Sequence, residues 1–372
     1  MILRDTLAEK LLAKVLGWQP LDIARERPVL QAMASLKYDE YDQFSPGLRF
    51  IESLALWLDQ FETSDRQTAY QFIKSSLVFC SSQEMDHLVE IAYQDHVRPI
   101  LLARSAGEQG LNPHHNGRIA SSIPFRILQR QTLFLGLSDG ARIDTFRRAN
   151  GPDLNHEQIW QTHELPRERG AELLSKLSLH LAEIDADVAI KAPKFRTIVL
   201  LDDFSASGSS YYSIKDSGSP SGKIATFLST LTSNNTALHE LCDPNGVEII
   251  VLIYMATEQA MDHLREALTN PTQGVARCYV RTVQLIPAKI KLSRGGPEEF
   301  TQLIEKYYDP AIFDVHMQKG KTKDGKYGYA DCGLPVVLQH NTPNNSVAIL
   351  WFYEHCNVRG IFPRVQRHRV MS

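Results

Sequence analysis

Short, uniformly apolar segments that alternate with helical patterns constrain this chain's fold most. Three such segments occur, at Thr132–Gly140, Thr197–Leu201 and Val247–Met255. Strands without a polar face are buried on both sides, as in parallel sheets that are covered by helices. Helical patterns stand between or after them, at residues 166–181, 223–232 and 258–268. The alternation predicts an α/β fold with a mostly parallel sheet.

The part of the chain before this pattern reads as helical. Ser45 and Pro46 form a helix-start signal, and Phe50, Leu54 and Leu58 then recur on one helical face. Residues 106–118 are rich in Gly, Asn and Pro and read as a linker. We therefore expect an all-helical, winged-helix-like domain over 1–108 and an α/β domain with a C-terminal extension over 109–372. Acidic residues outnumber basic residues in the first domain. This balance favours a packing or protein-interaction domain over a DNA-binding domain, which requires positive charge for phosphate contacts.

Composition excludes several classes of protein. The net charge is −3, so no global basic field indicates nucleic-acid binding. The five cysteines contain no C-x-x-C pair, which argues against a disulfide framework or a zinc site and favours a cytoplasmic protein. The longest apolar run, Ile249–Ala256, is too short to span a bilayer, so we expect no membrane partner.

Two adjacent carboxylates, Asp202 and Asp203, follow the second apolar segment. Ligands of open parallel sheets bind outside the carboxyl ends of the strands, so we expect both charges to lie beyond the apolar layer and face a ligand. Adjacent carboxylates suit a sugar diol or Mg²⁺. The small loop that comes next offers backbone N–H groups, hydroxyls and a glycine, which together suit a phosphate. Its predicted ligand-binding residues are Ser205, Ala206, Ser207, Gly208, Ser209 and Ser210.

The acid pair has two other interpretations. The simplest is a strand that ends in an Asp-capped turn with no ligand. The other is the acidic strand of a P-loop hydrolase, which requires the phosphate loop G-x-x-x-x-G-K-[ST]. The nearest candidate, G-S-P-S-G-K-I at Gly218–Ile224, is one residue short, lacks the Ser/Thr after the lysine and follows the acids instead of preceding them. The P-loop interpretation is therefore excluded.

The segment L-L-D-D-F-S-A-S-G-S-S resembles the phosphoribosyl-diphosphate (PRPP) motif of type I phosphoribosyltransferases. The resemblance implies that Asp202 and Asp203 hold the ribose hydroxyls, act in catalysis and hold Mg²⁺, while 205–210 wraps the 5-phosphate. In that family an earlier strand ends in a pyrophosphate loop, and T-L-F-L-G-L-S-D-G-A-R occupies that place. The residues of this second loop are Gly136, Ser138, Asp139, Gly140 and Arg142.

The chain departs from the family motif at two points. Ala206 replaces a hydroxyl residue and Ser209 replaces a second glycine of the family's phosphate loop. In the family a helix starts directly after the loop, whereas here the insert Tyr211–Gly222 intervenes. The insert could act as a lid, a specificity loop or a partner-binding loop. These departures leave open whether the site performs chemistry.

The whole chain resembles phosphoribosyltransferase-like proteins of bacterial antiphage and conflict systems, some encoded with retron reverse transcriptases. The motifs that carry this resemblance are W-L-D-Q-F, H-L-V-E-I-A-Y-Q-D-H-V-R-P-I, L-L-D-D-F-S-A-S-G-S-S, H-N-T-P-N-N-S and F-P-R-V-Q-R-H. It implies binding of PRPP or a nucleotide with Mg²⁺, transfer or cleavage at ribose C1 with release of pyrophosphate, and a defence-system partner such as a reverse transcriptase with its RNA or DNA. The alternatives are a non-catalytic nucleotide sensor and a nucleic-acid-associated subunit.

Two further segments have competing interpretations. The turn His340–Asn345 is rich in Asn, which favours a structural turn, although its amides could also close over a ligand. The arginine-rich end of the chain reads as a solvated terminus or as a grip for RNA, DNA or a phosphate. Its basic residues are Arg359, Arg364, Arg367, His368 and Arg369.

Overall fold

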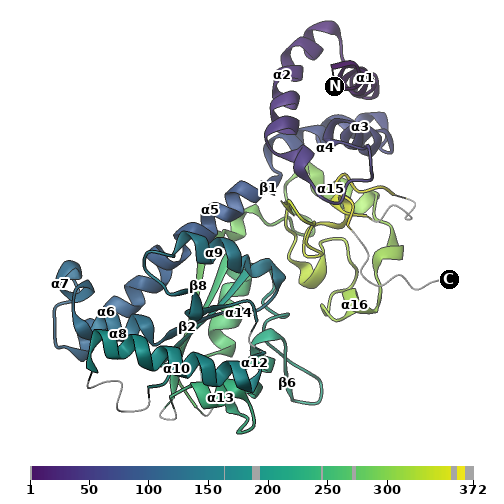
Figure 1. The fold of residues 1–372 in the computed structure, drawn as a ribbon. Coiled ribbons are helices and arrows are strands. Elements are labelled where there is room, and N and C mark those ends of the chain that lie inside the picture. The colour runs from purple at the N-terminus through teal and green to yellow at the C-terminus, as the bar shows by residue number, and fades with distance from the viewer. Residues whose placement is uncertain are drawn as a thin grey trace. The chain divides into compact units, whose positions relative to one another are not determined.

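The chain folds into two compact units (Figure 1). The α/β unit comprises Met85–Ile286, and the terminal unit joins Met1–Glu84 with Pro287–Ser372. The computed structural model describes residues 2–162, 164–186, 193–243, 246–269, 274–352 and 358–364.

Helices and strands alternate through the α/β unit, as the apolar pattern predicts. The strands are β2 (Thr132–Gly136), β3 (Ile159–Trp160), β4 (Thr197–Ser205), β5 (Ser213–Ile214), β6 (Pro220–Ser221), β7 (Val247–Thr257) and β8 (Val275–Ile286). The helices are α5 (Ser82–Ala92), which begins at the unit boundary, α6 (Arg98–Glu108), α7 (Asn116–Ala120), α8 (Ile123–Arg130), α9 (Ile143–Ala149), α10 (Arg167–Ile184), α12 (Lys223–Thr232), α13 (Ala237–Leu241) and α14 (Glu258–Ala267). A π-helical segment, Tyr93–Val97, joins α5 to α6.

Five of these strands form one sheet in the order β3-β2-β4-β7-β8. All four pairings are parallel. The central strand β4 aligns Leu201 with Leu252 of β7, which in turn aligns with Arg281 of β8. The expected α/β fold with a mostly parallel sheet is confirmed.

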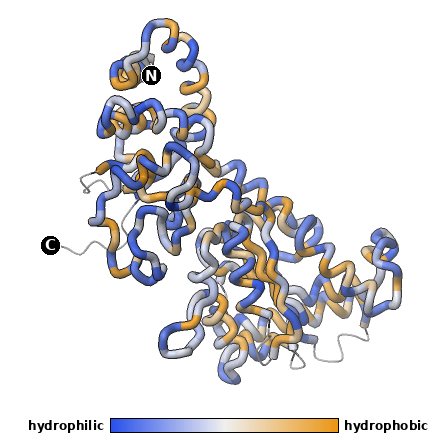
Figure 2. Tube along the Cα trace, turned by 180° about the vertical axis from the view of Figure 1, so that it is seen from behind, coloured by the Kyte–Doolittle hydropathy of each residue, from blue (hydrophilic) through white to orange (hydrophobic). Residues whose placement is uncertain are grey.

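The sheet is covered on both faces because its strands have no polar side. Ile198 and Leu200 of β4 belong to a buried cluster that also contains residues of α10, α12, α13 and α14. Phe134 of β2 lies on the opposite face, against the rings of Tyr93 and Phe146. The central strands form a continuous hydrophobic layer in Figure 2. This architecture places the carboxyl ends of β2, β4 and β7 along one edge of the sheet.

The terminal unit is mainly helical. Its elements are α1 (Ile2–Leu16), α2 (Pro20–Leu36), α3 (Phe50–Asp59), α4 (Thr63–Ser75), β1 (Val78–Cys80), α15 (Glu299–Lys306), α16 (Val315–Gln318) and β9 (Val336–Leu338). The two short strands, β1 and β9, pair in parallel. Among the helices that the structure describes, none has both the length and the apolar character required to cross a membrane.

The first four helices share one core with the C-terminal segments of the chain. Trp57 of α3 donates to the carbonyl of Ile349 at 3.0 Å, and Ser53 donates to that of Ile361 at 2.6 Å. Seven of the ten residues of α3 are buried, so this helix requires apolar partners, which residues 347–352 and 361–362 supply. The structure thus divides the chain differently from the expected boundary at residue 108. Helices α5 and α6 belong with the sheet, and the C-terminal extension belongs with the N-terminal helices.

Candidate functional site

The acid pair lies inside β4, at its carboxyl end. The strand runs to Ser205, four residues beyond the apolar segment that the sequence indicated, because residues 202–205 continue to pair with β7. Successive side chains of a strand point to opposite faces. Asp202 therefore shares the face of Ile198 and Leu200, whereas Asp203 points to the face of Phe134. The two carboxylates flank the edge of the sheet from opposite sides.

Asp202 does not face a ligand, contrary to the expectation for this residue. Its side chain is 0% exposed, since the sheet and α12 enclose it. The Ser138 hydroxyl donates to Oδ1, and the Lys223 ammonium forms an ion pair with Oδ2. Both carboxylate oxygens therefore have protein partners, and the charge is balanced inside the fold.

Lys223 is the residue of this site that the sequence did not predict. It is the first residue of α12, and its Nζ also lies 5.0 Å from the centre of the Tyr211 ring. Its side chain is 33% exposed, so the ammonium reaches both the buried Asp202 and the surface. The only available signal was the Gly222–Lys223 step at the start of a helical pattern, which alone does not indicate a ligand. Lys223 gives the carboxyl edge a positive charge next to the loop.

Asp203 is half-buried, and its carboxylate contacts the backbone of the next residue and the loop that contains Gly140. Its Oδ1 accepts a hydrogen bond from the backbone N–H of Phe204 at 2.8 Å. Gly140 approaches it so closely that a Cβ at that position would overlap the carboxylate. The structure thus brings together Asp203 and the predicted pyrophosphate loop, as the resemblance implies.

The loop Ser205–Ser210 presents several backbone donors without partners. Within the described residues, the N–H groups of Ser207, Gly208 and Ser210 form no hydrogen bond. The Ser205 hydroxyl is buried and also has no partner there. Buried polar groups in proteins are normally paired, so this set of open donors marks a place where an anion fits.

The loop is seated on the first turn of α14. Thr257, the N-cap of this helix, accepts from the N–H of Ala260 at 3.0 Å and donates to the carbonyl of Ala206. Gly208 has a φ of +76°, and a Cβ there would lie 2.8 Å from the ring of His263. Glycine is therefore required at this position by both the backbone and the packing. The departures from the family motif leave these supports in place, because Ala206 contributes its backbone carbonyl.

The insert Tyr211–Gly222 forms a small β-hairpin whose two ends lie next to each other. Strands β5 and β6 pair antiparallel, and the N–H of Lys223 donates to the carbonyl of Ser210 at 3.1 Å. Helix α12 consequently begins beside the end of the loop despite the intervening residues. The partial positive charge of its N-terminus is therefore available at the loop, which the sequence left open.

Two tyrosines fix the carboxyl edge from within the core. Tyr211 donates to the carbonyl of Phe204 at 3.0 Å, and Tyr254 donates to that of Ala141 at 2.7 Å. Burial raises the pKa of both phenols well above its usual value, and the nearby charges of Asp202 and Asp203 raise it further. Both side chains thus remain protonated donors that hold β4 and the predicted pyrophosphate loop in place.

Of the remaining residues of the predicted pyrophosphate loop, Gly136 and Arg142 contact other parts of the protein, whereas Asp139 faces solvent. A Cβ at Gly136 would lie 2.5 Å from the carbonyl oxygen of Gln161, so this glycine makes room for protein backbone. Asp139 is exposed. Arg142 adopts a left-handed conformation with φ of +46°, and its guanidinium pairs with Asp86 at 2.8 Å.

The two further segments singled out in the sequence lie in the terminal unit. In the turn His340–Asn345, the buried Thr342 bonds with Tyr41 at 2.9 Å, and Asn345 donates to the carbonyl of Tyr329 at 3.1 Å. These contacts favour the structural interpretation of the turn. Arg359 and Arg364 lie in described backbone, whereas Arg367, His368 and Arg369 fall outside the described residues.

Comparison with known proteins identifies the family. The comparison with curated proteins and the comparison with solved structures gave no match. The family model described as PRTase-CE matches residues 54–364, which includes every element of the sheet and the acid pair of β4. The chain therefore belongs to the PRTase-CE family of phosphoribosyltransferase-like proteins.

Proposed function

We propose that the α/β unit binds a ribose 5-phosphate compound, PRPP or a nucleotide, at the carboxyl end of β4. The observation that carries the proposal is the loop Ser205–Ser210, with its open backbone donors and the unpartnered Ser205 hydroxyl. Lys223 and the start of α12 add positive charge beside it. In this proposal the 5-phosphate occupies the loop, and the ribose hydroxyls lie toward Asp203.

Mg²⁺ is part of the proposal. Among the described residues, no group of three or more His, Cys, Asp or Glu side chains is arranged for a metal ion. Mg²⁺ is often held by one or two carboxylates together with substrate phosphates, and Asp203 would supply such a carboxylate, whereas both oxygens of Asp202 already have protein partners. When bound, the ion would neutralise the charge that develops on a departing pyrophosphate.

In a transfer reaction the bond from ribose C1 to pyrophosphate breaks while a bond from C1 to the acceptor forms. Ser138 and Gly140 lie directly beside the acid pair, so their loop is the proposed receiving place for pyrophosphate. Asp203 would orient the ribose, and Lys223 would hold the phosphate end. The acceptor is not assigned.

A second candidate is a non-catalytic sensor of the same ligand. Two observations favour it, namely that both oxygens of Asp202 are engaged by protein and that Arg142 pairs with Asp86. In a sensor, ligand binding would draw Lys223 from Asp202 to the phosphate. A binding signal without turnover is the expected behaviour.

Calorimetry with PRPP and Mg²⁺ tests the binding site. We expect Asp203→Asn and Lys223→Met each to weaken binding by about tenfold or more, because each removes one charged contact of the ligand. Asp262→Asn is the matched control, since this carboxylate is 78% exposed on α14 and contacts Arg265. A wild-type protein that binds neither PRPP nor a nucleotide contradicts the proposal. Release of pyrophosphate in the presence of candidate bases then separates the enzyme from the sensor.

We also propose a cytoplasmic role in antiphage defence, with a partner such as a reverse transcriptase and its RNA or DNA. The support is the resemblance of the chain to proteins of such systems. Phage plating on cells that carry the gene with its neighbours tests the role. The Asp202→Asn plus Asp203→Asn variant should then restore phage growth, and wild-type cells as sensitive as empty cells would refute a defence role.

A nucleic-acid-associated subunit is the remaining alternative. It predicts salt-dependent binding that weakens when Arg364, Arg367 and Arg369 become Ala. In the described part of the chain, the Arg364 guanidinium lies 6.0 Å from the Trp351 ring centre.

A further inference from the structure

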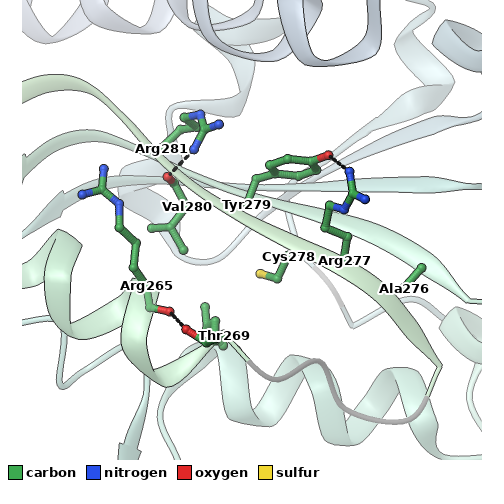
Figure 3. A pocket seen from close by; sticks show the side chains of 9 residues that line it. Arg265, Thr269, Ala276, Arg277, Cys278, Tyr279, Val280 and Arg281 are labelled. Carbon is green, nitrogen blue, oxygen red and sulfur yellow. Dashed lines mark hydrogen bonds between the residues drawn. The ribbon is translucent and has the colours of Figure 1, made fainter. Parts of the chain in front are cut away.

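The edge strand β8 carries a second concentration of positive charge, away from the carboxyl edge. A cavity of about 370 Å³ lies against its first half. Nine residues line this cavity; three of them are arginines and none is an acid. The arginines come from two elements, with Arg265 on α14 and Arg277 and Arg281 on β8 (Figure 3). A lining of this composition attracts an anion.

The two arginines of β8 flank one aromatic ring. Arg277, Tyr279 and Arg281 are alternate residues of the strand and therefore share a face. Both guanidinium carbons lie near the Tyr279 ring centre, at 5.8 and 5.6 Å, and Arg277 donates to its hydroxyl at 2.9 Å. Figure 3 shows the phenol between the two arginines. The ring thus fixes two planar cation groups on one side of the strand.

Three acids lie near the two arginines of β8, because Asp95, Glu108 and Glu248 line a neighbouring cavity together with Arg277 and Arg281. In the described part of the chain, neither arginine forms an ion pair, and Arg281 donates only to the carbonyl of Val280 at 3.0 Å. Glu248 aligns with Arg277 in the neighbouring strand, but its carboxylate pairs with Arg104 at 3.2 Å. Arg265 has a weak partner in the exposed Asp262, at 3.6 Å. The cavity consequently keeps a surplus of donors that match phosphate oxygens.

This place is separate from the proposed PRPP site. Arg277 aligns with Glu248 of β7, whereas Ser205 of the loop aligns with Ala256, eight residues further along the same strand. Arg281 aligns with Leu252, four residues before Ala256, so at the rise of a β-strand Arg277 and Arg281 lie roughly 25 and 13 Å from the loop along the strand direction.

We propose that the β8 cavity is a second binding site, for a phosphate group carried by a nucleotide-sized compound or by a nucleic-acid strand. Its volume lies within the range of small-molecule sites. Arg277 and Arg281 bind the phosphate oxygens, and Arg265 closes the cavity from α14. The alternative is that the arginines only protect an exposed edge strand from pairing with another chain.

The test compares variants of the full chain that differ only outside the first site, so that any binding at the first site is common to all of them. The probes are pyrophosphate, AMP and a short single-stranded oligonucleotide, measured by calorimetry. At least one probe should bind, and adding Arg277→Gln plus Arg281→Gln should weaken it by about tenfold or more. The probe that binds identifies the source of the phosphate.

Arg118→Gln plus Arg126→Gln is the matched control, because these exposed arginines of α7 and α8 lie in the same unit and change the net charge equally. It should leave the affinity unchanged. The Arg277→Lys plus Arg281→Lys variant keeps the charge and the fold and should lose affinity to a smaller degree. Absence of binding by all three probes, or equal weakening in the two Gln variants, would overturn the second site and leave the protective role.

Discussion

The two units bury polar side chains in different ways. In the terminal unit, Trp57 and Ser53 donate to carbonyls of the C-terminal segment, and Tyr41 bonds with Thr342. These neutral contacts join distant parts of the chain, and the buried ion pair of Glu26 with Lys74 in this unit lies among bonded partners instead of beside a loop. In the α/β unit, a charged Asp202 is buried against Lys223, next to a loop whose donors have no partner in the described residues. The first arrangement stabilises a fold, whereas the second is suited to a ligand.

The largest expected effect is in the core of the terminal unit. Phe362 is fully buried among the rings of Tyr38, Tyr41, Phe50 and Phe79. Phe362→Ala should lower the free energy of unfolding of this unit by about 4 kcal/mol, because it removes a large side chain and leaves a cavity. Denaturation followed by tryptophan fluorescence measures it, since three of the four tryptophans lie in this unit.

The matched control for that change is Val315→Ala, whose side chain is 73% exposed and whose stability effect should be small. PRPP binding should persist in Phe362→Ala under conditions where the protein stays folded. Loss of PRPP binding in a folded Phe362→Ala protein would contradict the assignment of ligand binding to the α/β unit alone.

The second effect concerns the buried ion pair. Lys223→Met should destabilise the α/β unit by about 3 kcal/mol, because it leaves the Asp202 carboxylate buried without its cation. Amide hydrogen exchange in β4 and β7 measures this change. The double variant with Asp202→Asn should recover most of the loss, since no buried charge remains. Equal destabilisation in the single and double variants would show that the pair is not coupled.

A third change tests whether the close contact between Gly140 and the Asp203 carboxylate contributes to ligand binding. Gly140→Ala places a methyl group where the Asp203 carboxylate lies, and it should weaken PRPP binding by about tenfold, equivalent to about 1.4 kcal/mol. Gly107→Ala in α6 is the control, because a Cβ there meets no atom within 4 Å. That control should stabilise the helix by about 0.5–1 kcal/mol. Unchanged PRPP affinity in Gly140→Ala would show that the contact between Gly140 and Asp203 does not contribute to binding.

The smallest effect is a pH dependence in the terminal unit. Burial raises the pKa of Glu26, but hydrogen bonds from Lys74, Tyr70 and Arg25 outweigh it, so the pKa lies below its ordinary value of 4.5. A lowered folded pKa gives stability that is present above pH 4.5 and is lost as the pH falls through the folded value. Glu26→Gln should cost about 1 kcal/mol at neutral pH and flatten this dependence.

Urea denaturation of the terminal unit between neutral and acid pH checks the Glu26 effect. Asp42→Asn, which changes an exposed acid of the same unit, serves as the control. An identical slope below pH 4.5 in Glu26→Gln and the wild type would rule out Glu26 as its source.

Local pattern predicted the sheet but not its outer strands or the division into units. Apolar runs indicated β2, β4 and β7 because these strands are buried on both faces. Strand β8 escaped prediction because an edge strand keeps polar residues such as Arg277 and Arg281. The core that α3 shares with residues 347–352 and 361–362 depends on contacts about 300 positions apart, which no local pattern encodes.

The candidate site was foreseen in part. The order of acids, small hydroxyl residues and glycine located the end of β4 and its loop, because these residue types favour a turn after an apolar strand. The enclosure of Asp202 and the role of Lys223 were not foreseen, because the hairpin between them returns the chain to the loop. That return is a property of the three-dimensional fold.

The most direct test of the central claim is a crystal structure of the chain with PRPP or a nucleotide and Mg²⁺. The account predicts a phosphate against the backbone N–H groups of Ser207–Ser210, with Lys223 drawn toward it and the ribose beside Asp203. A ligand bound elsewhere, with this loop empty and the Lys223–Asp202 pair intact, would contradict it.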